Sequence, residues 1–220
     1  MSMFALLVSI VPHNKGEKLT AAAVQAGCGG GTVMMGRQLA KTNLAAVLGL
    51  GETTKDIIYM VVESRQKQNI IDAIVNASLL EKPDFGQLFS LDVDQMMKTA
   101  IITPLNDQGE KTMQTEKSRD MISVIVNKGY ADDVMAAARR AGAGGGTVIN
   151  ARGTAREDDE KFFGVHIVPE KEMLVIILEH EKKAAVLDAI RDLKCLREPG
   201  SGIAFSSGVD DFTLLGKKNA

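Results

Sequence analysis

The sequence has no tryptophan, two tyrosines and two cysteines among its 220 residues, and each scarcity argues against a class of protein. With no Trp and so few Tyr side chains, the chain has little material for the aromatic platforms on which nucleic-acid bases stack. Cys28 and Cys195 stand far apart and outside any CxxC pattern. This usage argues against a structural zinc site and fits the reducing environment of the cytoplasm, where we expect the protein to work.

The chain also lacks a large excess of charge of either sign. The formal net charge is −2, so the sequence offers no basic face for nucleic acid or for an anionic membrane. No apolar stretch reaches the roughly 18–20 residues that span a bilayer. The apolar opening, MSMFALLVSIVPHNK, carries neither a basic segment nor a small-residue cleavage site, and we interpret it as a buried strand.

No residue pattern indicates catalysis or metal binding. His13, His166 and His180 fall in unrelated parts of the chain and show no metal-ligand spacing. No nucleophile–base pair or carboxylate pair characteristic of an enzyme recurs along the sequence. We therefore expect a protein that is not an enzyme and that holds no resident metal or cofactor.

What the sequence does contain is an internal repeat. AGCGGGTVMMGR begins at Ala26, and AGAGGGTVINARG begins at Ala141, 115 positions later. Further identities at this offset, or at one position more, are Ile10-Val11 with Ile125-Val126 and Asp72-Ala73-Ile74 with Asp188-Ala189-Ile190. Matching over this length indicates a tandem duplication.

Each copy shows the same order of element patterns. Apolar, β-branched runs indicate strands, amphipathic Ala-rich runs indicate helices, and Asp132 is the expected N-cap of the first helix of the second copy. In the first copy, we expect strands at 6–11, from Thr32, at 56–63 and at 87–93, and helices at 17–26 and 66–80. In the second copy, we expect strands at 122–126, from Thr147, at 172–179 and at 203–209, and helices at 133–141 and 181–196.

The order β-α-β-β-α-β, present twice, predicts an α+β protein of two tandem ferredoxin-like sandwich domains. We place the first domain at 1–96, a polar linker at 97–120 and the second domain at 121–220. The strand patterns are apolar on both faces, so both faces of each sheet need cover. This predicts a homo-oligomer.

The glycines of the repeated motif have two interpretations. They follow a helix and precede a strand, whereas a dinucleotide-binding loop precedes its helix, and no GK[ST] follows them as in a P-loop. The first interpretation is a helix end at Gly27 and Gly142 with a tight turn into the next strand. The second is a backbone that another group, such as a ligand, approaches closely.

The second copy resembles the P-II nitrogen-regulator family. The segment ISVIVNKGYADDVMAAARRAGAGGGTV (122–148) is similar to that family's first strand, helix and second strand. VHIVPEKEMLVIILE (165–179) resembles its return from the long T-loop, and PGSGIAF (199–205) resembles its Gly-x-Gly B-loop. Gly36-Arg37-Gln38 in the first copy is similar to the sequence at the family's T-loop base.

The resemblance implies a trimeric, non-catalytic signalling protein that senses a small ligand in clefts between domains. The implied ligand is an adenine nucleotide (ATP, ADP or AMP), which is sensed rather than used as a cofactor. The residues that match the family's binding motifs, or equivalent positions in the other copy, are Thr32, Arg37, Gln38, Thr147, Arg152, Gly200, Ser201 and Gly202. The B-loop lysine of the family is Ile203 here, and acidic Asp210 and Asp211 stand where the family has arginines.

The resemblance also implies a partner protein, such as a membrane transporter or a metabolic enzyme, in the regulation of nitrogen utilisation. The T-loop equivalents, 38–55 and 153–171, differ in charge and apolar content. Each either packs on its own domain or orders on the partner. The alternative function is a structural or scaffold module of the same fold that has lost its ligand.

Overall fold

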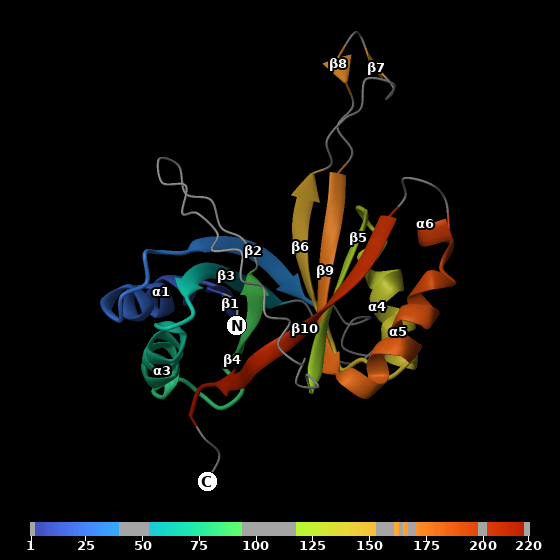
Figure 1. Ribbon diagram of the computed structural model, residues 1–220. Coiled ribbons are helices and arrows are strands. Elements are labelled where there is room, and N and C mark those ends of the chain that lie inside the picture. Colours follow the sequence, from blue (N-terminus) through green and yellow to red (C-terminus); the bar gives the residue numbers. More distant parts are fainter. Residues whose placement is uncertain are drawn as a thin grey trace. The chain divides into compact units, whose positions relative to one another are not determined.

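A computed structural model (Figure 1) describes residues 3–39, 53–93, 118–152, 161–162, 165–166, 170–197 and 202–217. The chain divides into two compact units, and neither is continuous in sequence. Unit 1 comprises Met1–Met34, Asp56–Ser118 and Gly208–Ala220, and unit 2 comprises Met35–Lys55 and Arg119–Ser207. Most of the predicted linker, most of both T-loop equivalents, and Gly200 and Ser201 lie outside the described residues.

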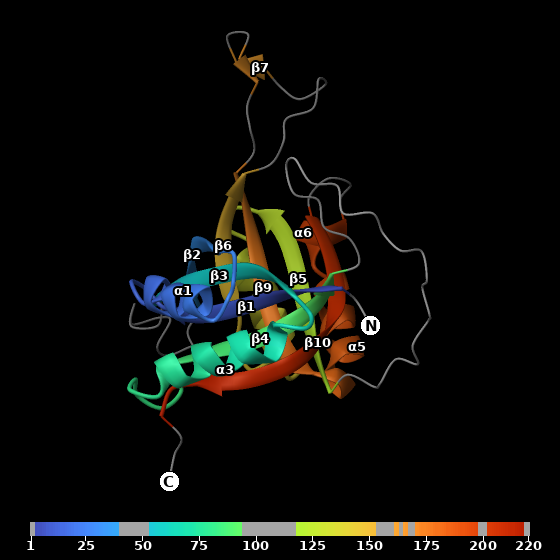
Figure 2. The ribbon, with the colours of Figure 1, turned by 60° about the vertical axis from the view of Figure 1, so that its left-hand side comes forward.

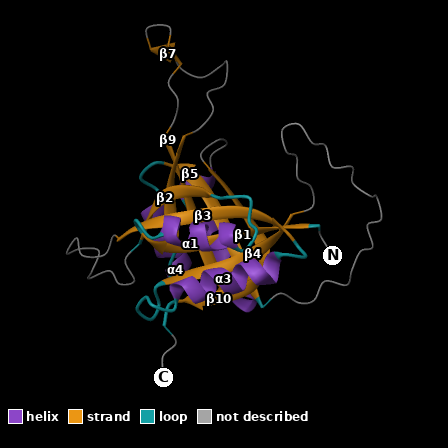
Figure 3. Ribbon diagram, turned by 90° about the vertical axis from the view of Figure 1, so that its left-hand side faces the viewer, coloured by secondary structure: helices purple, strands orange, loops and turns teal. Residues whose placement is uncertain are grey.

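Unit 1 is an antiparallel sheet with two helices packed together on one face (Figures 2 and 3). Its strands lie in the order β2-β3-β1-β4-β10, and its core joins alternate strand residues with the apolar faces of both helices. The elements are β1 (Phe4–Pro12), α1 (Gly16–Gln25), β2 (Thr32–Gln38), β3 (Thr53–Glu63), α3 (Lys67–Ser78), β4 (Gly86–Val93) and the last residues of β10 (Gly202–Leu215).

Unit 2 repeats this arrangement with strands in the order β2-β6-β9-β5-β10. The elements are β5 (Arg119–Asn127), α4 (Ala131–Arg140), β6 (Thr147–Arg152), the hairpin β7 (Lys161–Phe162) and β8 (Val165–His166), β9 (Glu170–Glu179), η1 (His180–Lys182), α5 (Lys183–Arg191) and α6 (Lys194–Arg197). The single helix predicted over 181–196 is therefore divided into three pieces. Both units show the predicted α+β, ferredoxin-like order of elements.

Two strands each contribute to both units. The first residues of β2 belong to unit 1, whereas Gly36–Gln38 pair with β6 in unit 2. The first residues of β10 belong to unit 2, whereas Leu214 and Leu215 pair with β4 in unit 1. The division into domains at 1–96 and 121–220 stays a prediction. The last residues of β2 come from the first repeat but lie in unit 2, and the last residues of β10 come from the second repeat but lie in unit 1.

Strand residues on both faces of the sheets are buried. In β3, Ile58 lies in the core under the helices, while its neighbour Ile57 points to the other face and is equally buried. Phe89 of β4 is likewise buried on the sheet face away from the helices. This agrees with the apolar patterns on both strand faces, while the homo-oligomer inferred from them stays a prediction.

The first helix of each repeat ends as predicted. Gly27 and Gly142 follow the last helical turns with φ angles of 104° and 103°. Cys28 N–H donates to the Ala23 carbonyl, which closes the helix end in a Schellman-type arrangement. The prediction for the start of the second-copy helix is wrong. Tyr130 is the N-cap and Asp132 lies inside the first turn, because a carboxylate from another strand occupies the capping position.

Candidate functional site

A buried carboxylate closes the start of the first helix in both repeats. Oε2 of Glu172, on β9, accepts hydrogen bonds from the backbone N–H groups of Gly129 (3.0 Å) and Ala131 (3.2 Å). Oδ2 of Asp56, at the equivalent position on β3, accepts one from Gly16 (3.0 Å). Both carboxylates are only 4% exposed. Each satisfies helix N–H groups that no local side chain caps, and its charge is favourable at the positive end of the helix dipole.

Each buried carboxylate also contacts one basic side chain through its other oxygen atom. His13 Nδ1 lies 2.9 Å from Asp56 Oδ1 in unit 1. In unit 2, Arg37 Nη2 lies 3.2 Å from Glu172 Oε1 and 3.5 Å from an oxygen of Asp132. Arg37 belongs to the first repeat in sequence, yet its side chain anchors the end of β2 to the helix start of unit 2.

The end of β2 is held to unit 2 by its backbone as well. Gln38 pairs with Thr147 and Arg37 with Val148 across the β2–β6 ladder. The Leu39 N–H donates to the Gly146 carbonyl (3.2 Å), and the Leu39 side chain, 4% exposed, lies in the core of unit 2. The structure therefore brings two of the predicted ligand residues, Gln38 and Thr147, together on one face of the sheet, while the neighbouring Arg37 points to the opposite face, which the helices cover.

The two equivalent threonines differ in environment. Thr147 is 6% exposed and lies on the sheet face opposite the helices, as does its strand partner Gln38. Thr32 is exposed at the start of β2 in unit 1. Thr32 and the Arg37-Gln38 pair are thus assigned to different units although they are five and six positions apart in sequence.

Gly202 and Arg152 are not grouped with Thr147. Within unit 2 two strands separate β6 from β10, which places Gly202 about 14 Å away across the sheet. A Cβ on Gly202 would lie 2.8 Å from the Ile125 carbonyl oxygen, so packing alone requires glycine there. Arg152 is exposed at the far end of β6, opposite Glu170.

The repeated glycine motif is explained mainly by the protein's own packing. A Cβ on Gly31 would lie 2.7 Å from Met60 Cγ, and one on Gly146 would lie 2.8 Å from Leu174 Cδ1. Each glycine therefore lets the chain pass close to β3 or β9. By contrast, a Cβ on Gly29 or Gly144 would meet nothing within 4 Å.

Asp56 and Glu172 were not predicted from the sequence as functional residues. The signal was present, because both strongest strand patterns, DIIYMVVE and EMLVIILE, begin with an acidic residue at equivalent positions. From the sequence alone, a carboxylate at the start of an apolar strand is interpreted as a solvent-exposed residue at the strand end. Only the fold shows that the start of the first helix of the same repeat lies beside it.

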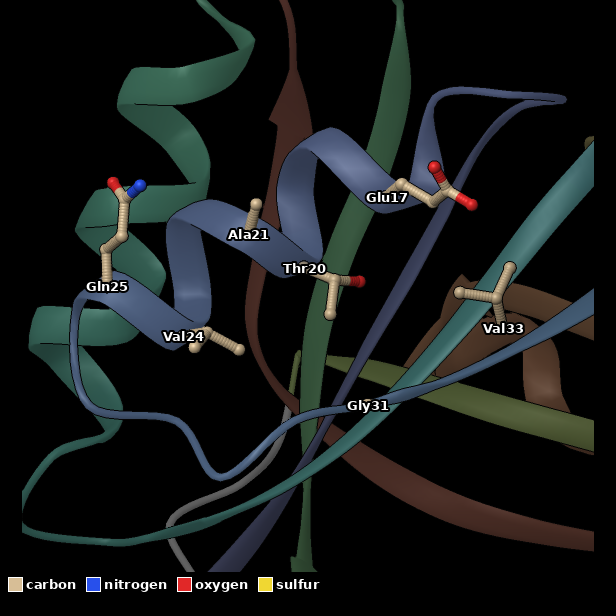
Figure 4. Close-up of a pocket in the computed structure, with 7 residues that line it drawn as sticks. All are labelled: Glu17, Thr20, Ala21, Val24, Gln25, Gly31 and Val33. Atoms are coloured by element: carbon tan, nitrogen blue, oxygen red, sulfur yellow. The ribbon is translucent and has the colours of Figure 1, made fainter.

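Two cavities open on the helix side of the sheets, and no predicted ligand residue lines either. The cavity of unit 2 measures about 540 Å³ and is lined by Asn127, Tyr130, Asp133, Ala136, Arg140, Leu193, Lys194 and Cys195. Burial raises the pKa of the Cys195 thiol. The cavity of unit 1 (Figure 4) measures about 500 Å³ and is lined by Glu17, Thr20, Ala21, Val24, Gln25, Gly31 and Val33.

Over the described ranges, no three His, Cys, Asp or Glu side chains group closely enough to hold a metal ion. None of the helices in those ranges has the length and apolar content needed to cross a bilayer.

The repeated β-α-β-β-α-β order, with helices on one face of each sheet, defines an α+β protein of the ferredoxin-like class. Within this class the second repeat can be assigned. Residues 119–217 match the family model of the Nitrogen regulatory protein P-II. The match confirms the resemblance seen in the sequence.

Solved structures to which the chain is similar include PII from Arabidopsis thaliana bound to citrate, at 21% identity over 43% of this chain and 78% of that chain, with a TM-score of 0.33. A protein of unknown function from Galdieria sulphuraria aligns over 94% of this chain and 99% of its own, at 11% identity and a TM-score of 0.30. A microcompartment protein from Desulfitobacterium hafniense aligns over 94% and 95%, at 13% identity and a TM-score of 0.28. No curated protein sequence matches the chain.

Proposed function

We propose that this protein is a non-catalytic, P-II-like regulator that binds a small ligand and passes the signal to a partner protein. The observation that carries the proposal is the P-II match over residues 119–217, which includes both Thr147 and the helix start held by Glu172. The ligand is an adenine nucleotide, and the partner is a membrane transporter or a metabolic enzyme of nitrogen utilisation. The proposed setting is the cytoplasm, and the proposed assembly is a homotrimer.

The proposed ligand contacts are the side chains of Gln38 and Thr147. They face each other on neighbouring strands, so one small ligand can touch both. An amide and a hydroxyl supply both donors and acceptors, which suits the mixed donor and acceptor edge of adenine. Thr147 is almost covered, so its hydroxyl would form the floor of the site and Gln38 its accessible wall.

Phosphate recognition is expected to be weak. The guanidinium of Arg37 is engaged by Glu172 and Asp132 on the helix side of the sheet, away from Gln38 and Thr147, so it does not reach a phosphate of the ligand. Ile203 replaces the family's B-loop lysine. We therefore expect AMP, ADP and ATP to bind with affinities within about fivefold of one another, because solvent-exposed charge contacts to the extra phosphates are worth less than about 1 kcal/mol.

Ligand binding would act through the end of β2. A ligand that touches both Gln38 and Thr147 binds only when the two strands are paired, so it stabilises the paired state by mass action. Gln38 and Leu39 lead directly into the first T-loop equivalent. The ligand would thereby fix the start of the segment that meets the partner.

The test is a calorimetric and thermal-shift titration with ATP, ADP, AMP, cyclic AMP and 2-oxoglutarate, alongside the native mass. We expect saturable binding of an adenine nucleotide to a trimer, loss of binding in Thr147→Val, and little change in the matched variant Thr32→Val. Flat titrations across the whole panel would contradict the proposal.

Flat titrations would favour the second candidate function, a scaffold that has lost its ligand. The specific observation in favour of that candidate is the use of Arg37 as a structural anchor together with the loss of the B-loop lysine.

A further inference from the structure

The end of β2 fills a slot in unit 2 whose counterpart in unit 1 is an open cavity. In unit 2, Leu39 lies in the same buried cluster as Val148 and Met135, and its N–H donates to the Gly146 carbonyl. Two positions earlier, Arg37 reaches Asp132 and Glu172. The occupant of the slot is therefore a short extended segment of the type Arg-x-Leu.

The internal repeat maps this slot onto the cavity of unit 1. Gly31 and Val33, which line that cavity, are the counterparts of Gly146 and Val148, and Thr20 is the counterpart of Met135. Figure 4 shows Thr20 and Val24 of α1 on the side of the helix that faces the chain at Gly31. The floor is built alike in both units, since Gly31 and Gly146 pass equally close to the neighbouring strand.

The two slots differ in how far they are covered. Val148 is completely buried, whereas Val33 is 42% exposed and Val24, across the groove on α1, is 48% exposed. The counterpart of Leu39 in the second repeat is Thr154, which has no aliphatic side chain of that size. The groove of unit 1 thus keeps an apolar lining that suits a leucine-sized group.

The acidic groups that hold Arg37 are also present in unit 1. Glu17, which lines the cavity, is the counterpart of Asp132, and Asp56 is the counterpart of Glu172. Within the described part of unit 1, no ion pair includes Glu17. A basic side chain two residues before the leucine would find a carboxylate in the same relative place.

We propose that the groove between α1 and the start of β2 is a docking site for an extended Arg-x-Leu segment of a partner protein. By the register of unit 2, the leucine fills the cavity beside Gly31, the backbone runs along the start of β2, and the arginine lies beside Val33 and meets Glu17. This is strand addition with one side-chain pocket, a known mode of peptide recognition. The inference depends on the internal repeat and is independent of the nucleotide proposal.

The probe is a synthetic peptide of residues 35–41, MGRQLAK, added to the full-length protein. Nuclear magnetic resonance is expected to show saturable shifts at the amides of Gly31, Thr32 and Val33. Replacing the peptide's leucine by alanine should weaken binding about tenfold or more, because most of the buried apolar area is lost. Replacing its arginine by glutamate should also weaken binding.

Two matched protein variants test the location. Val33→Lys should abolish the shifts, while Val61→Lys, at a strand valine of the same unit with the same 42% exposure and outside the groove, should leave them unchanged. Equal binding by both variants, shifts confined to Gly146 and Val148, or no binding at millimolar peptide would overturn the proposal.

Discussion

At the residue scale, the account depends on two buried carboxylates that do the work of helix caps. Asp56 and Glu172 come from the third strand of each repeat and accept the N–H groups that begin α1 and α4. Neither helix has a side-chain cap from its own N-cap residue, Lys15 or Tyr130. Because these bonds join distant parts of the chain, they fix each helix on its sheet as well as closing its end.

Removing the Glu172 carboxylate should destabilise the protein. Glu172→Ala leaves the N–H groups of Gly129 and Ala131 and the guanidinium of Arg37 without their buried acceptor, and we expect a loss of about 2–4 kcal/mol in the free energy of unfolding. Chemical denaturation measures this loss. The control Glu170→Ala, at an exposed site on the same strand, should change it by less than about 0.5 kcal/mol; equal losses would contradict the capping role.

The Cys195 thiol should be less reactive than the thiol of an exposed cysteine. Burial raises the pKa of Cys195, so its thiolate is scarcer at neutral pH than that of a model peptide. In Cys28→Ala, whose new residue copies Ala143 of the second repeat, alkylation of Cys195 by iodoacetamide should rise with pH to a midpoint above that of a cysteine peptide. A midpoint below the peptide value would contradict this environment.

At the element scale, the end of β2 is the segment that links the repeats. Its residues are close in sequence to unit 1, but they pair with β6 and contribute Leu39 to the core of unit 2. The strand and helix order of each repeat followed from apolar periodicity, and the helix ends followed from Gly27 and Gly142. The pairing of the end of β2 with β6 could not be predicted in this way. Apolar periodicity indicates which face of a strand is buried, but it does not indicate which other strand lies beside it.

Leu39 should contribute to the stability of unit 2 despite its place in the first repeat. Leu39→Ala removes a buried aliphatic side chain, and we expect a loss of about 2–4 kcal/mol in the free energy of unfolding. Val33→Ala, at an exposed position of the same strand, should cost less than about 1 kcal/mol. Chemical denaturation followed by the amide signals of individual residues would show which unit loses stability. A loss of stability confined to unit 1 would contradict the place of Leu39 in the core of unit 2.

The candidate site shows the same limit of sequence reasoning. Gln38 and Thr147 were both selected from the resemblance, but only the β2–β6 ladder shows that they are neighbours. Gly202 was selected as a B-loop residue, and the fold shows that its lack of a side chain is required by the Ile125 carbonyl. Ligand residues gathered from different elements need the fold before they can be grouped.

At the scale of the whole molecule, the two repeats are predicted to be interdependent. A fragment of residues 1–96 lacks the end of β10 that pairs with β4, and a fragment of residues 118–220 lacks the end of β2 that pairs with β6. Each unit would then lose a strand and expose an unpaired edge.

Separated fragments should therefore be unstable alone and stable together. Purified fragments 1–96 and 118–220 are expected to unfold at lower temperature than the intact chain and to form a one-to-one complex on mixing, measured by native mass and thermal denaturation. Two fragments that are each as stable as the intact protein and do not associate would contradict the sharing of β2 and β10.

We propose that a nucleotide bound at Gln38 and Thr147 stabilises the docked end of β2. The Leu39 amide, whose hydrogen bond to Gly146 reports this docking, can be followed by hydrogen exchange with and without saturating AMP. The account predicts slower exchange at Leu39 and an unchanged rate at Phe85, whose amide bonds to Leu215 in unit 1. An unchanged rate at Leu39 while AMP is bound would contradict it.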